Sequence, residues 1–291
     1  MSLHPRQMTA RPLVTTKAVI LCGGLGTRLR EETEYRPKPL VPIGDRPILW
    51  HIMKTYAAFG VTDFILALGY KGEMIKDFFL NYEALVSDFT IDLSSKSITP
   101  LNGAHGEASW RVTLVDTGQA TQTGGRLKRL QPLLDDQDRF MLTYGDGVSD
   151  VDLDALVQFH QDSGCAVALT GVRPMARFGE LMTSGDRVVR FAEKPASGDA
   201  WINGGYFVMT PRVFDYLEGD ETILERQPLE RLAQERQLAV FKHDGYWQCM
   251  DTYRDVVLLN EEWASGRAPW KRWQDRQAAA KAPKFRPKLA S

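Results

Sequence analysis

The sequence predicts an α/β fold, in which an open, mostly parallel mixed sheet is flanked by helices, with a small β-rich insertion. The first observation is that short apolar runs alternate with segments of helical periodicity between residues 17 and 81. The second is that these runs are continuously apolar, as expected of strands buried on both faces of a parallel sheet. At 291 residues, the chain is also long enough to bury one large core.

The first part of the chain carries this alternation most clearly. We expect a buried strand at residues 18–22, followed at once by a glycine-rich turn. Apolar residues at helical spacing predict a helix at 48–59, and Gly60 suits the position just past its end. A strand at 64–68 and a helix at 71–81 then complete two strand–helix units.

Residues 84–110 interrupt this rhythm. The segment is rich in Ser, Asn and Gly, and we expect a loop or hairpin insertion with short strands at 89–93 and 96–101. Four elements are expected after it: a strand at 112–115, a second glycine-rich turn at 123–126, a short helix at 127–131 that Pro132 ends, and a strand at 140–144. The core sheet therefore continues beyond the insertion.

The second half is expected to be mixed and richer in strands. Its predicted helices are 153–163, ended by Gly164, then 222–237, which Pro228 either breaks or reopens, and 253–265. Its predicted strands are 166–170, 178–181, 188–191, 205–209, 239–243 and 246–249. We treat residues 17–273 as one domain, with flexible segments at 1–16 and 274–291.

Composition argues against several classes of protein. Apolar residues make up 43% of the chain and charged residues 25%, and the formal net charge is −1. A general nucleic-acid binder usually carries a strong basic excess, and no apolar run here is long enough for a membrane span or a signal peptide. The three cysteines are far apart and form no C-x-x-C pair, which fits reduced thiols in a cytoplasmic protein.

The segment directly after the first strand is the strongest candidate for a binding site. Gly23, Gly24 and Gly26 let the backbone turn sharply, and bare N–H groups in such a turn form an anion site. Arg28 adds a planar cation, and the prolines on either side of Lys38 help to aim its ammonium group. Neither G-x-G-x-x-G nor the P-loop pattern is matched. The plain alternative is a tight strand-to-helix turn with both cations solvated.

Two aspartates are candidates for a metal site. Asp146 follows a predicted strand within Gly-Asp-Gly, and Asp251 lies between a predicted strand and a helix. Carboxylates that meet at one point are the ligands Mg²⁺ uses when it also holds substrate phosphates. Taken singly, Asp146 fits a turn and Asp251 a helix cap better than a metal site. Together with the glycine-rich turn they favour a metal site.

A third group of residues suits a sugar phosphate. Glu193 can accept hydroxyl protons and Lys194 can meet a phosphate, while Asn203 presents an amide beside Gly204 and Gly205. An ion-pair-rich surface turn and a plain hairpin turn are the structural alternatives. No Ser/His/Asp or Cys/His arrangement stands out, which argues against covalent catalysis.

These motifs occur in the order seen in the sugar-1-phosphate nucleotidylyltransferases, and the chain resembles that family over residues 17–273. The shared motifs are G-G-L-G-T-R with P-K-P, G-D-G, F-x-E-K-P, I-N-G-G-Y-F and W-Q-C-M-D-T. The runs D-T-G-x(5)-G-G-R-L-K-R, Y-G-D-G-V and A-P-W-K-x-W are most similar to the branch that uses CTP and glucose 1-phosphate. An insertion at 103–109 has no clear counterpart in this pattern.

The resemblance implies a Rossmann-like nucleotidyltransferase fold, a reaction and an assembly. CTP and α-D-glucose 1-phosphate would be the substrates, Mg²⁺ the cofactor, and CDP-glucose and pyrophosphate the products. The product would serve the biosynthesis of dideoxyhexoses for lipopolysaccharide O-antigen. The resemblance also implies a homo-oligomer, specifically a hexamer.

The same resemblance assigns roles position by position. It implies that Arg28, Lys38 and Asp146 are catalytic and that Asp146 and Asp251 bind Mg²⁺. The residues that would bind the sugar phosphate are Glu193, Lys194, Asn203 and Gly204. The residues that would bind the nucleotide are Leu21, Cys22, Gly23, Gly24, Leu25, Gly26, Thr27, Arg28, Lys38, Thr121, Arg126 and Gly145.

Three alternatives stay open at this point. The base of the nucleotide could be uracil or thymine instead of cytosine. The chain could be a catalytically dead, sugar-nucleotide-binding regulator, although such a protein would be expected to lose Lys38, Asp146 or Asp251, and all three are present. A dinucleotide-dependent oxidoreductase is disfavoured because Leu29 replaces the third glycine of the fingerprint.

Overall fold

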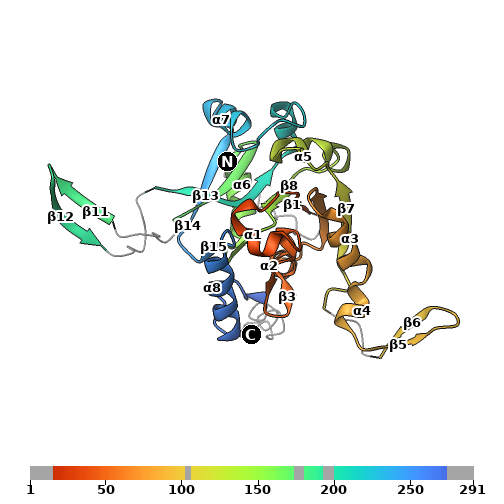
Figure 1. Cartoon of the computed structure of the whole chain (residues 1–291). Coiled ribbons are helices and arrows are strands. Elements are labelled where there is room, and N and C mark those ends of the chain that lie inside the picture. The colour runs from red at the N-terminus through yellow and green to blue at the C-terminus, as the bar shows by residue number, and fades with distance from the viewer. Residues whose placement is uncertain (1–15, 102–105, 174–179, 193–199, 274–291) are drawn as a thin grey trace, which may run out of the picture.

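A seven-stranded sheet forms the centre of the protein, as the computed structural model shows for residues 16–101, 106–173, 180–192 and 200–273 (Figure 1). Its strands are β1 (Lys17–Cys22), β4 (Asp63–Leu68), β7 (Arg111–Asp116), β8 (Phe140–Tyr144), β10 (Val167–Val172), β13 (Ile202–Met209) and β14 (Leu238–His243). They lie in the order β14-β10-β13-β8-β1-β4-β7. Only β13 runs antiparallel to its neighbours among these strands, so the predicted mostly parallel mixed sheet is confirmed.

The register brings four strand ends to one edge of this sheet. Cys22 pairs with Leu68, Leu68 pairs with Asp116, and Leu21 pairs with Tyr144. The carboxyl ends of β1, β4, β7 and β8 therefore lie side by side. Ligands of open α/β sheets bind at this edge, and the glycine-rich turn and the Gly-Asp-Gly turn both begin there.

Helices cover both faces of the sheet, as predicted. They are α1 (Arg30–Thr33), α2 (Ile48–Ala58), α3 (Gly72–Leu80), α4 (Tyr82–Val86), α5 (Thr123–Arg129), α6 (Leu153–Ser163), α7 (Gln227–Gln234) and α8 (Tyr253–Ala264). Ile20 of β1 packs in one apolar cluster with residues of α2, α3, α6 and α8. Val19 and Leu21, whose side chains alternate with that of Ile20, pack in a second cluster with residues of α5 and α7.

Four short 3-10 helices and four small two-stranded sheets complete the described structure. The 3-10 helices are Thr27–Leu29, Lys38–Leu40, Gln131–Leu133 and Pro211–Tyr216. The small sheets pair β2 (Pro42–Ile43) with β3 (Arg46–Pro47), β5 (Phe89–Asp92) with β6 (Ser97–Pro100), β9 (Gly147–Ser149) with β15 (Trp247–Cys249), and β11 (Glu180–Ser184) with β12 (Arg187–Ala192). None of the described helices is long and apolar enough to cross a membrane.

Two of these small sheets are hairpins that extend away from the body. Figure 1 shows β5–β6 and β11–β12 reaching out on different sides of the molecule. The first confirms the hairpin expected between residues 84 and 110. Its apolar side chains Ile91 and Ile98 face each other across the strands, and both are about half exposed.

Two predictions about helices were wrong. The segment 123–126 was expected to be a turn, but it forms the first part of α5, and its two glycines fit there because the chain at 219–222 approaches closely. A Cβ on Gly125 would lie 2.6 Å from the carbonyl oxygen of Asp220. The helix expected at 222–237 spans only Gln227–Gln234, and Pro228 lies in its first turn, so the alternative in which this proline opens a helix is confirmed.

The segment after α8 packs back on α2 through aromatic rings. Trp270 is fully buried, and its Nε1 donates to Nδ1 of His51 at 3.4 Å. Trp263 of α8 lies edge-on to the same imidazole, with the ring centroids 4.6 Å apart. Gly44 leaves room for Trp263, since a Cβ there would lie 2.3 Å from its Nε1. These contacts tie α8 to the β2–β3 turn, which follows the Lys38 segment directly.

Candidate active site

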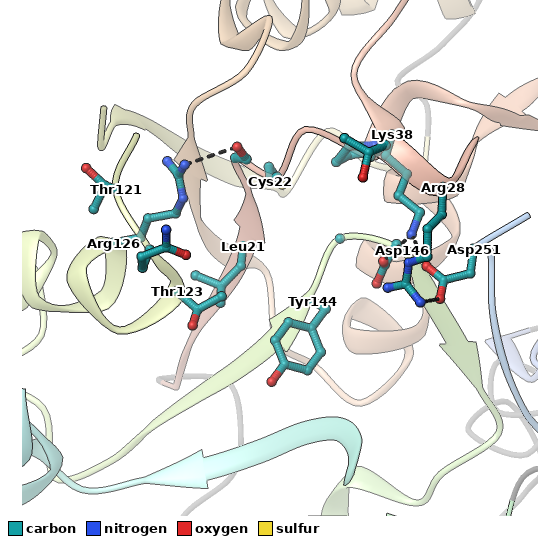
Figure 2. Close-up of a pocket in the computed structure, with 17 residues that line it drawn as sticks. Leu21, Cys22, Arg28, Lys38, Thr121, Thr123, Arg126, Tyr144, Asp146 and Asp251 are labelled. Carbon is teal, nitrogen blue, oxygen red and sulfur yellow. Dashed lines mark hydrogen bonds and ion pairs between the residues drawn. The ribbon is translucent and has the colours of Figure 1, made fainter. Parts of the chain in front are cut away.

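A cavity of about 290 Å³ opens at the carboxyl edge of the sheet, where the sequence predicted a binding site. Figure 2 shows its two sides. Lys38, Arg28, Asp146 and Asp251 converge on one side, while Thr121, Thr123 and Arg126 lie on the other. Its lining consists of Leu21, Cys22, Gly23, Gly24, Gly26, Thr27, Arg28, Lys38, Pro39, Thr121, Gln122, Thr123, Arg126, Tyr144, Gly145, Asp146 and Asp251.

The glycine-rich turn needs its glycines for two different reasons. Gly26 has φ of 64°, a left-handed conformation that glycine adopts easily, and a Cβ there would lie 2.5 Å from the side chain of Thr33. A Cβ on Gly23 would lie 2.2 Å from the guanidinium carbon of Arg126. The turn therefore fits closely against its neighbours on one side, while Gly24 has no atom within 4 Å of a Cβ position and borders open space.

Lys38 joins the two aspartates predicted to hold a metal. Its Nζ lies 2.6 Å from Oδ2 of Asp146 and 2.6 Å from Oδ1 of Asp251. Arg28 meets the other oxygen of Asp251 at 2.5 Å, although three quarters of the Arg28 side chain is exposed. Two carboxylates and two cations from four separate parts of the chain thus form one cluster.

The charge state of Lys38 follows from opposing effects. Burial on its own lowers the pKa of the ammonium group, because it removes water from the charged form. The charge and hydrogen bond of Asp146, and then those of Asp251, outweigh burial and raise the pKa above its usual value. Lys38 is therefore a permanent cation at neutral pH.

Backbone pairing brings the two aspartates together. Strand β9 follows Asp146 and pairs with β15, which precedes Asp251, so that Cys249 lies opposite Gly147. The N–H of Met250 donates to the carbonyl oxygen of Asp146 at 2.8 Å. The N–H of Asp251 donates to the carboxylate of Asp255 in the first turn of α8 at 3.0 Å. The separation of the two carboxylates is thus set by a β-bridge and a helix N-terminus.

The donor set around Lys38 fits a magnesium ion bound together with a substrate. Oxygens of Asp146 and Asp251 already reach a single positive atom, the ammonium nitrogen of Lys38. Mg²⁺ takes one or two protein carboxylates and completes its shell with water and substrate phosphates. Among the described residues, no group of three or more His, Cys, Asp or Glu side chains could hold a metal ion. The pair therefore fits a metal that arrives with a phosphorylated ligand.

Arg126 holds the other side of the cavity. The guanidinium group is buried and donates to the carbonyl oxygens of Gly23, Leu68, Gly118 and Gln119 and to the hydroxyl of Thr117, at 2.7–3.3 Å. Burial lowers the pKa of this arginine, and the charge of Asp116 offsets part of that effect. The side chain thus binds the glycine-rich turn to the ends of β4 and β7.

Most of the residues predicted to bind the nucleotide line the cavity. Leu25 does not, and its side chain is 53% exposed. Asn203 and Gly204 also lie outside the lining, but Nδ2 of Asn203 donates to the hydroxyl of Tyr144, which does line it, at 3.2 Å. Glu193 and Lys194 lie outside the described residues, as do residues 1–15 of the segment predicted to be flexible at 1–16 and all of the segment predicted to be flexible at 274–291.

Sequence reasoning missed four lining residues, which are Pro39, Gln122, Thr123 and Tyr144. A signal for two of them was present, since Pro39 belongs to the P-K-P motif and Tyr144 to Y-G-D-G-V. Thr123 begins α5, the helix that was taken for a turn. A helix starting there points its first turn at the cavity, so correct placement of the helix would have indicated Thr123 and Gln122.

Comparisons with known proteins agree with this geometry. Residues 17–257 match the model of the family described as nucleotidyl transferase. The glucose-1-phosphate cytidylyltransferase of Salmonella typhi is 49% identical over 265 residues, covering 89% of this chain and 100% of that protein. The mannose-1-phosphate guanyltransferase of Candida albicans is 30% identical over 249 residues, covering 83% of this chain and 62% of that protein.

Solved structures show the same fold at lower identity. The crystal structure of HddC from Yersinia pseudotuberculosis superposes with a TM-score of 0.62 at 23% identity, covering 86% of this chain and 100% of that one. A structure of UDP-glucose pyrophosphorylase complexed with UDP-glucose superposes with a TM-score of 0.60 at 16% identity, covering 87% and 99%. At these identities the likeness concerns the fold alone.

Proposed function

The chain belongs to the nucleotidyl transferase family, and on that premise we propose that it transfers a cytidylyl group from CTP to α-D-glucose 1-phosphate. The products are CDP-glucose and pyrophosphate. The observation that carries the proposal is the cluster in which Lys38 joins Asp146 and Asp251 beside a glycine-rich turn. The assignment of CTP and glucose 1-phosphate as the substrates rests on the 49% identity to the Salmonella typhi protein over the whole length of that protein.

The proposed reaction is an in-line displacement at phosphorus. A phosphate oxygen of glucose 1-phosphate forms a new bond to the α-phosphorus of CTP, and the bond from that phosphorus to the bridging oxygen of pyrophosphate breaks. The attacking phosphate is already ionised at neutral pH, so no side chain has to remove a proton from it. Catalysis then consists of positioning the two substrates and neutralising the charge that develops.

The described residues supply both of these effects. The glycine-rich turn lines the cavity where a triphosphate would lie, and Arg28 and Lys38 add positive charge there. In the ligand-free protein Lys38 is charged, because Asp146 and Asp251 raise its pKa. Its ammonium group can leave the carboxylates and meet phosphate oxygens when the nucleotide enters, and its charge then matters most as negative charge grows on the leaving pyrophosphate.

Asp146 and Asp251 would hold the divalent metal, for which Mg²⁺ is our proposal. When bound, Mg²⁺ supplies positive charge to the phosphate oxygens at the reaction centre. The two carboxylates fit this role because their oxygens meet at one point and because both line the cavity, Asp146 partly exposed and Asp251 buried. Lys38 and Arg28 balance the carboxylates in the ligand-free protein.

A second activity in the same class would be use of UTP or dTTP in place of CTP. The cavity lining contains several polar groups beside the glycine-rich turn, among them Thr121, Gln122 and Thr123. Reading the exocyclic amine of cytosine requires an acceptor, and reading the oxygen of uracil requires a donor. Backbone and side-chain groups of both kinds are present there, so we assign cytosine from the similarity to the Salmonella typhi protein.

We further propose that the chain is a cytoplasmic homo-oligomer, specifically a hexamer, and that its product serves the biosynthesis of dideoxyhexoses for O-antigen. Support for an oligomer comes from the β5–β6 hairpin, which extends from the body and exposes Ile91, Leu93 and Ile98. Apolar surface of this kind is often covered by another protein chain. Light scattering coupled to size-exclusion chromatography measures the number of subunits.

The experiment that tests the proposed reaction is a substrate panel. Pyrophosphate release is measured with CTP, UTP, dTTP, ATP and GTP, each against glucose 1-phosphate, galactose 1-phosphate and mannose 1-phosphate. We expect CTP with glucose 1-phosphate to have the highest kcat/KM. A clear preference for dTTP or UTP would contradict the assignment of cytosine and leave the fold unaffected.

A further inference from the structure

Glu225 lies beside the cavity and forms hydrogen bonds with two residues that line it, Tyr144 and Thr123. It belongs to the loop before α7 and is exposed, yet both of its carboxylate oxygens are engaged. Oε1 accepts the hydroxyl proton of Tyr144 at 2.5 Å, and Oε2 accepts the hydroxyl proton of Thr123 at 2.6 Å. Thr123 opens α5, and its oxygen accepts a bond from the N–H of Leu224 at 3.0 Å. An exposed carboxylate is thus held in one place.

Tyr144 connects Glu225 to Asn203. Its ring packs on Gly205, where a Cβ would lie 2.6 Å from the ring, and its hydroxyl oxygen accepts from Nδ2 of Asn203 at 3.2 Å. Oδ1 of Asn203 in turn accepts from the N–H of Gly205 at 2.9 Å. Four groups therefore form one chain of hydrogen bonds, which runs from Thr123 through Glu225 and Tyr144 to Asn203.

Glu225 determines which groups donate and which accept along this series of hydrogen bonds. An ionised carboxylate accepts hydrogen bonds and cannot donate them. The hydroxyl proton of Tyr144 must therefore point at Glu225, which leaves the oxygen of Tyr144 to accept from Asn203. Burial raises the pKa of Tyr144, and the charge of Glu225 raises it further, so this proton stays on the phenol at neutral pH. The amide of Asn203 is thereby held with its nitrogen toward Tyr144 and its oxygen toward the backbone.

We propose that Glu225 is a positioning residue for the sugar-phosphate substrate: through this relay of hydrogen bonds it keeps the oxygen of Tyr144 free to accept from Asn203, and so holds the amide nitrogen of Asn203 in place. This inference rests on the proposed function and on the sugar-phosphate role that the family resemblance implies for Asn203. Of the two N–H bonds of the Asn203 amide, one is given to Tyr144, and the other can donate to a sugar hydroxyl. If the hydroxyl proton of Tyr144 pointed at Asn203 instead, it would meet the donor Nδ2, and the amide, whose oxygen is held by the N–H of Gly205, would lose the bond that fixes its nitrogen.

Glu225→Gln tests the proposal because glutamine is similar in size but can donate as well as accept. A glutamine that donates to Tyr144 allows the phenol proton to turn toward Nδ2 of Asn203, where two donors meet, so the hydrogen bond that holds the amide nitrogen is lost. We expect KM for the sugar phosphate to rise about tenfold, while kcat and KM for the nucleotide change less than about threefold. The matched control is Glu221→Gln, an exposed carboxylate four residues earlier in the same loop, and it is expected to match the wild type.

Tyr144→Phe supplies a second, independent variant, because it keeps the ring and removes the hydroxyl through which Glu225 acts. If the relay exists, the double variant Glu225→Gln/Tyr144→Phe has a KM for the sugar phosphate close to that of Tyr144→Phe alone. The proposal is overturned if Glu225→Gln keeps the wild-type KM, or if the effects of the two substitutions multiply. A merely structural role would lower the melting temperature of Glu225→Gln and leave KM unchanged, which also contradicts the proposal.

The assay uses whichever nucleotide and sugar 1-phosphate the wild-type protein turns over best in the panel above. If that pair is not CTP with glucose 1-phosphate, the proposed reaction is wrong, but the KM for the preferred sugar phosphate still decides the role of Glu225. Failure of the proposed function and failure of the relay are therefore separate results.

Discussion

Nζ of Lys38 lies 2.6 Å from Oδ2 of Asp146, although 108 positions separate the two residues in the sequence. The lysine follows the glycine-rich turn, and the aspartate follows β8 at the same edge of the sheet. Their contact places a fixed cation and a partly exposed carboxylate at the mouth of the cavity. The proposed mechanism depends on this relationship, because the two groups must separate when a nucleotide and its metal ion enter.

The first prediction concerns the metal ligands. Asp146→Asn and Asp251→Asn are each expected to reduce kcat by about a hundredfold or more, since the bound metal contributes several kcal/mol to the transition state. An amide keeps the size of the side chain but loses the negative charge that a hard cation requires. Steady-state assays at saturating Mg²⁺ measure this loss, and circular dichroism checks that the variants are folded.

A second measurement on the same variants is independent of turnover. Binding of Mn²⁺ in the presence of CTP, followed by electron paramagnetic resonance, should be weakened in both variants. The control is Asp152→Asn, a helix-cap aspartate on the surface, which should bind Mn²⁺ as the wild type does. Normal Mn²⁺ binding and normal turnover in either active-site variant would remove that residue from the list of ligands.

The second prediction concerns Arg126. Arg126→Lys should lower the free energy of unfolding by about 2–4 kcal/mol, because lysine cannot reach all the carbonyl oxygens that the planar group satisfies and each unpaired buried carbonyl costs about 1–3 kcal/mol. The glycine-rich turn should loosen, so KM for the nucleotide should rise. Urea unfolding followed by tryptophan fluorescence measures the first effect, and nucleotide titration of the rate measures the second.

Arg129→Lys is the matched control for Arg126→Lys. Arg129 lies three residues further along α5, and its guanidinium pairs with Asp220 at the surface. Exposed pairs contribute at most about 1 kcal/mol, so this variant should be nearly as stable as the wild type. Equal stability of the two lysine variants would show that the buried hydrogen bonds of Arg126 do not hold the turn.

The third prediction is a pH dependence of stability that arises at His51. Burial is the main reason that the pKa of this imidazole falls from 6.5 to about 4. The neutral ring accepts from Trp270 at Nδ1 and faces the carbonyl oxygen of Ile43 with Nε2, so an added proton on Nδ1 would meet another N–H group. A folded pKa below the unfolded one means that this stability is complete above pH 6.5 and is lost as the pH falls toward 4.

The expected size of the His51 effect is about 2 kcal/mol between pH 7.5 and pH 4.5, from the shift of the pKa and the linkage relation. Urea unfolding at both pH values measures it in the wild type and in His51→Gln, which has no titrating group at this position. The variant should be less stable at pH 7.5 but should lose about 2 kcal/mol less on acidification. Parallel losses in the two proteins would assign the acid sensitivity to other groups.

The sequence predicted the parts of the fold that local pattern determines. Buried strands such as β4 and amphipathic helices such as α6 were located to within about a residue, because a continuous apolar run or a helical period is visible in one segment. The glycine pair in α5 was misread, because its reason lies in the close approach of residues 219–222, which are distant in sequence. A glycine next to a distant carbonyl looks the same in the sequence as a glycine in a turn.

For the same reason, the sequence predicted many residues of the candidate site but not the contacts between them. Lys38, Asp146 and Asp251 stood out through their motifs, but their direct contact depends on the pairing of β9 with β15. The carbonyl oxygens that accept from Arg126 belong to the backbone, so the types of the residues that carry them do not reveal the contact. Glu225 belongs to no recognised motif, and only the folded chain brings it beside Tyr144.

The most direct test of the proposed mechanism is Lys38→Ala, studied by steady-state kinetics together with calorimetric binding of CTP. The cation should matter more for the charge that develops during transfer than for the bound nucleotide, so kcat should fall by a larger factor than the affinity for CTP. Lys38→Arg should restore only part of kcat, because a planar fork cannot occupy the place of an ammonium group between two carboxylates. Unchanged turnover in Lys38→Ala would contradict the catalytic role, and weaker CTP binding with an unchanged kcat would reduce Lys38 to an anchor for the nucleotide.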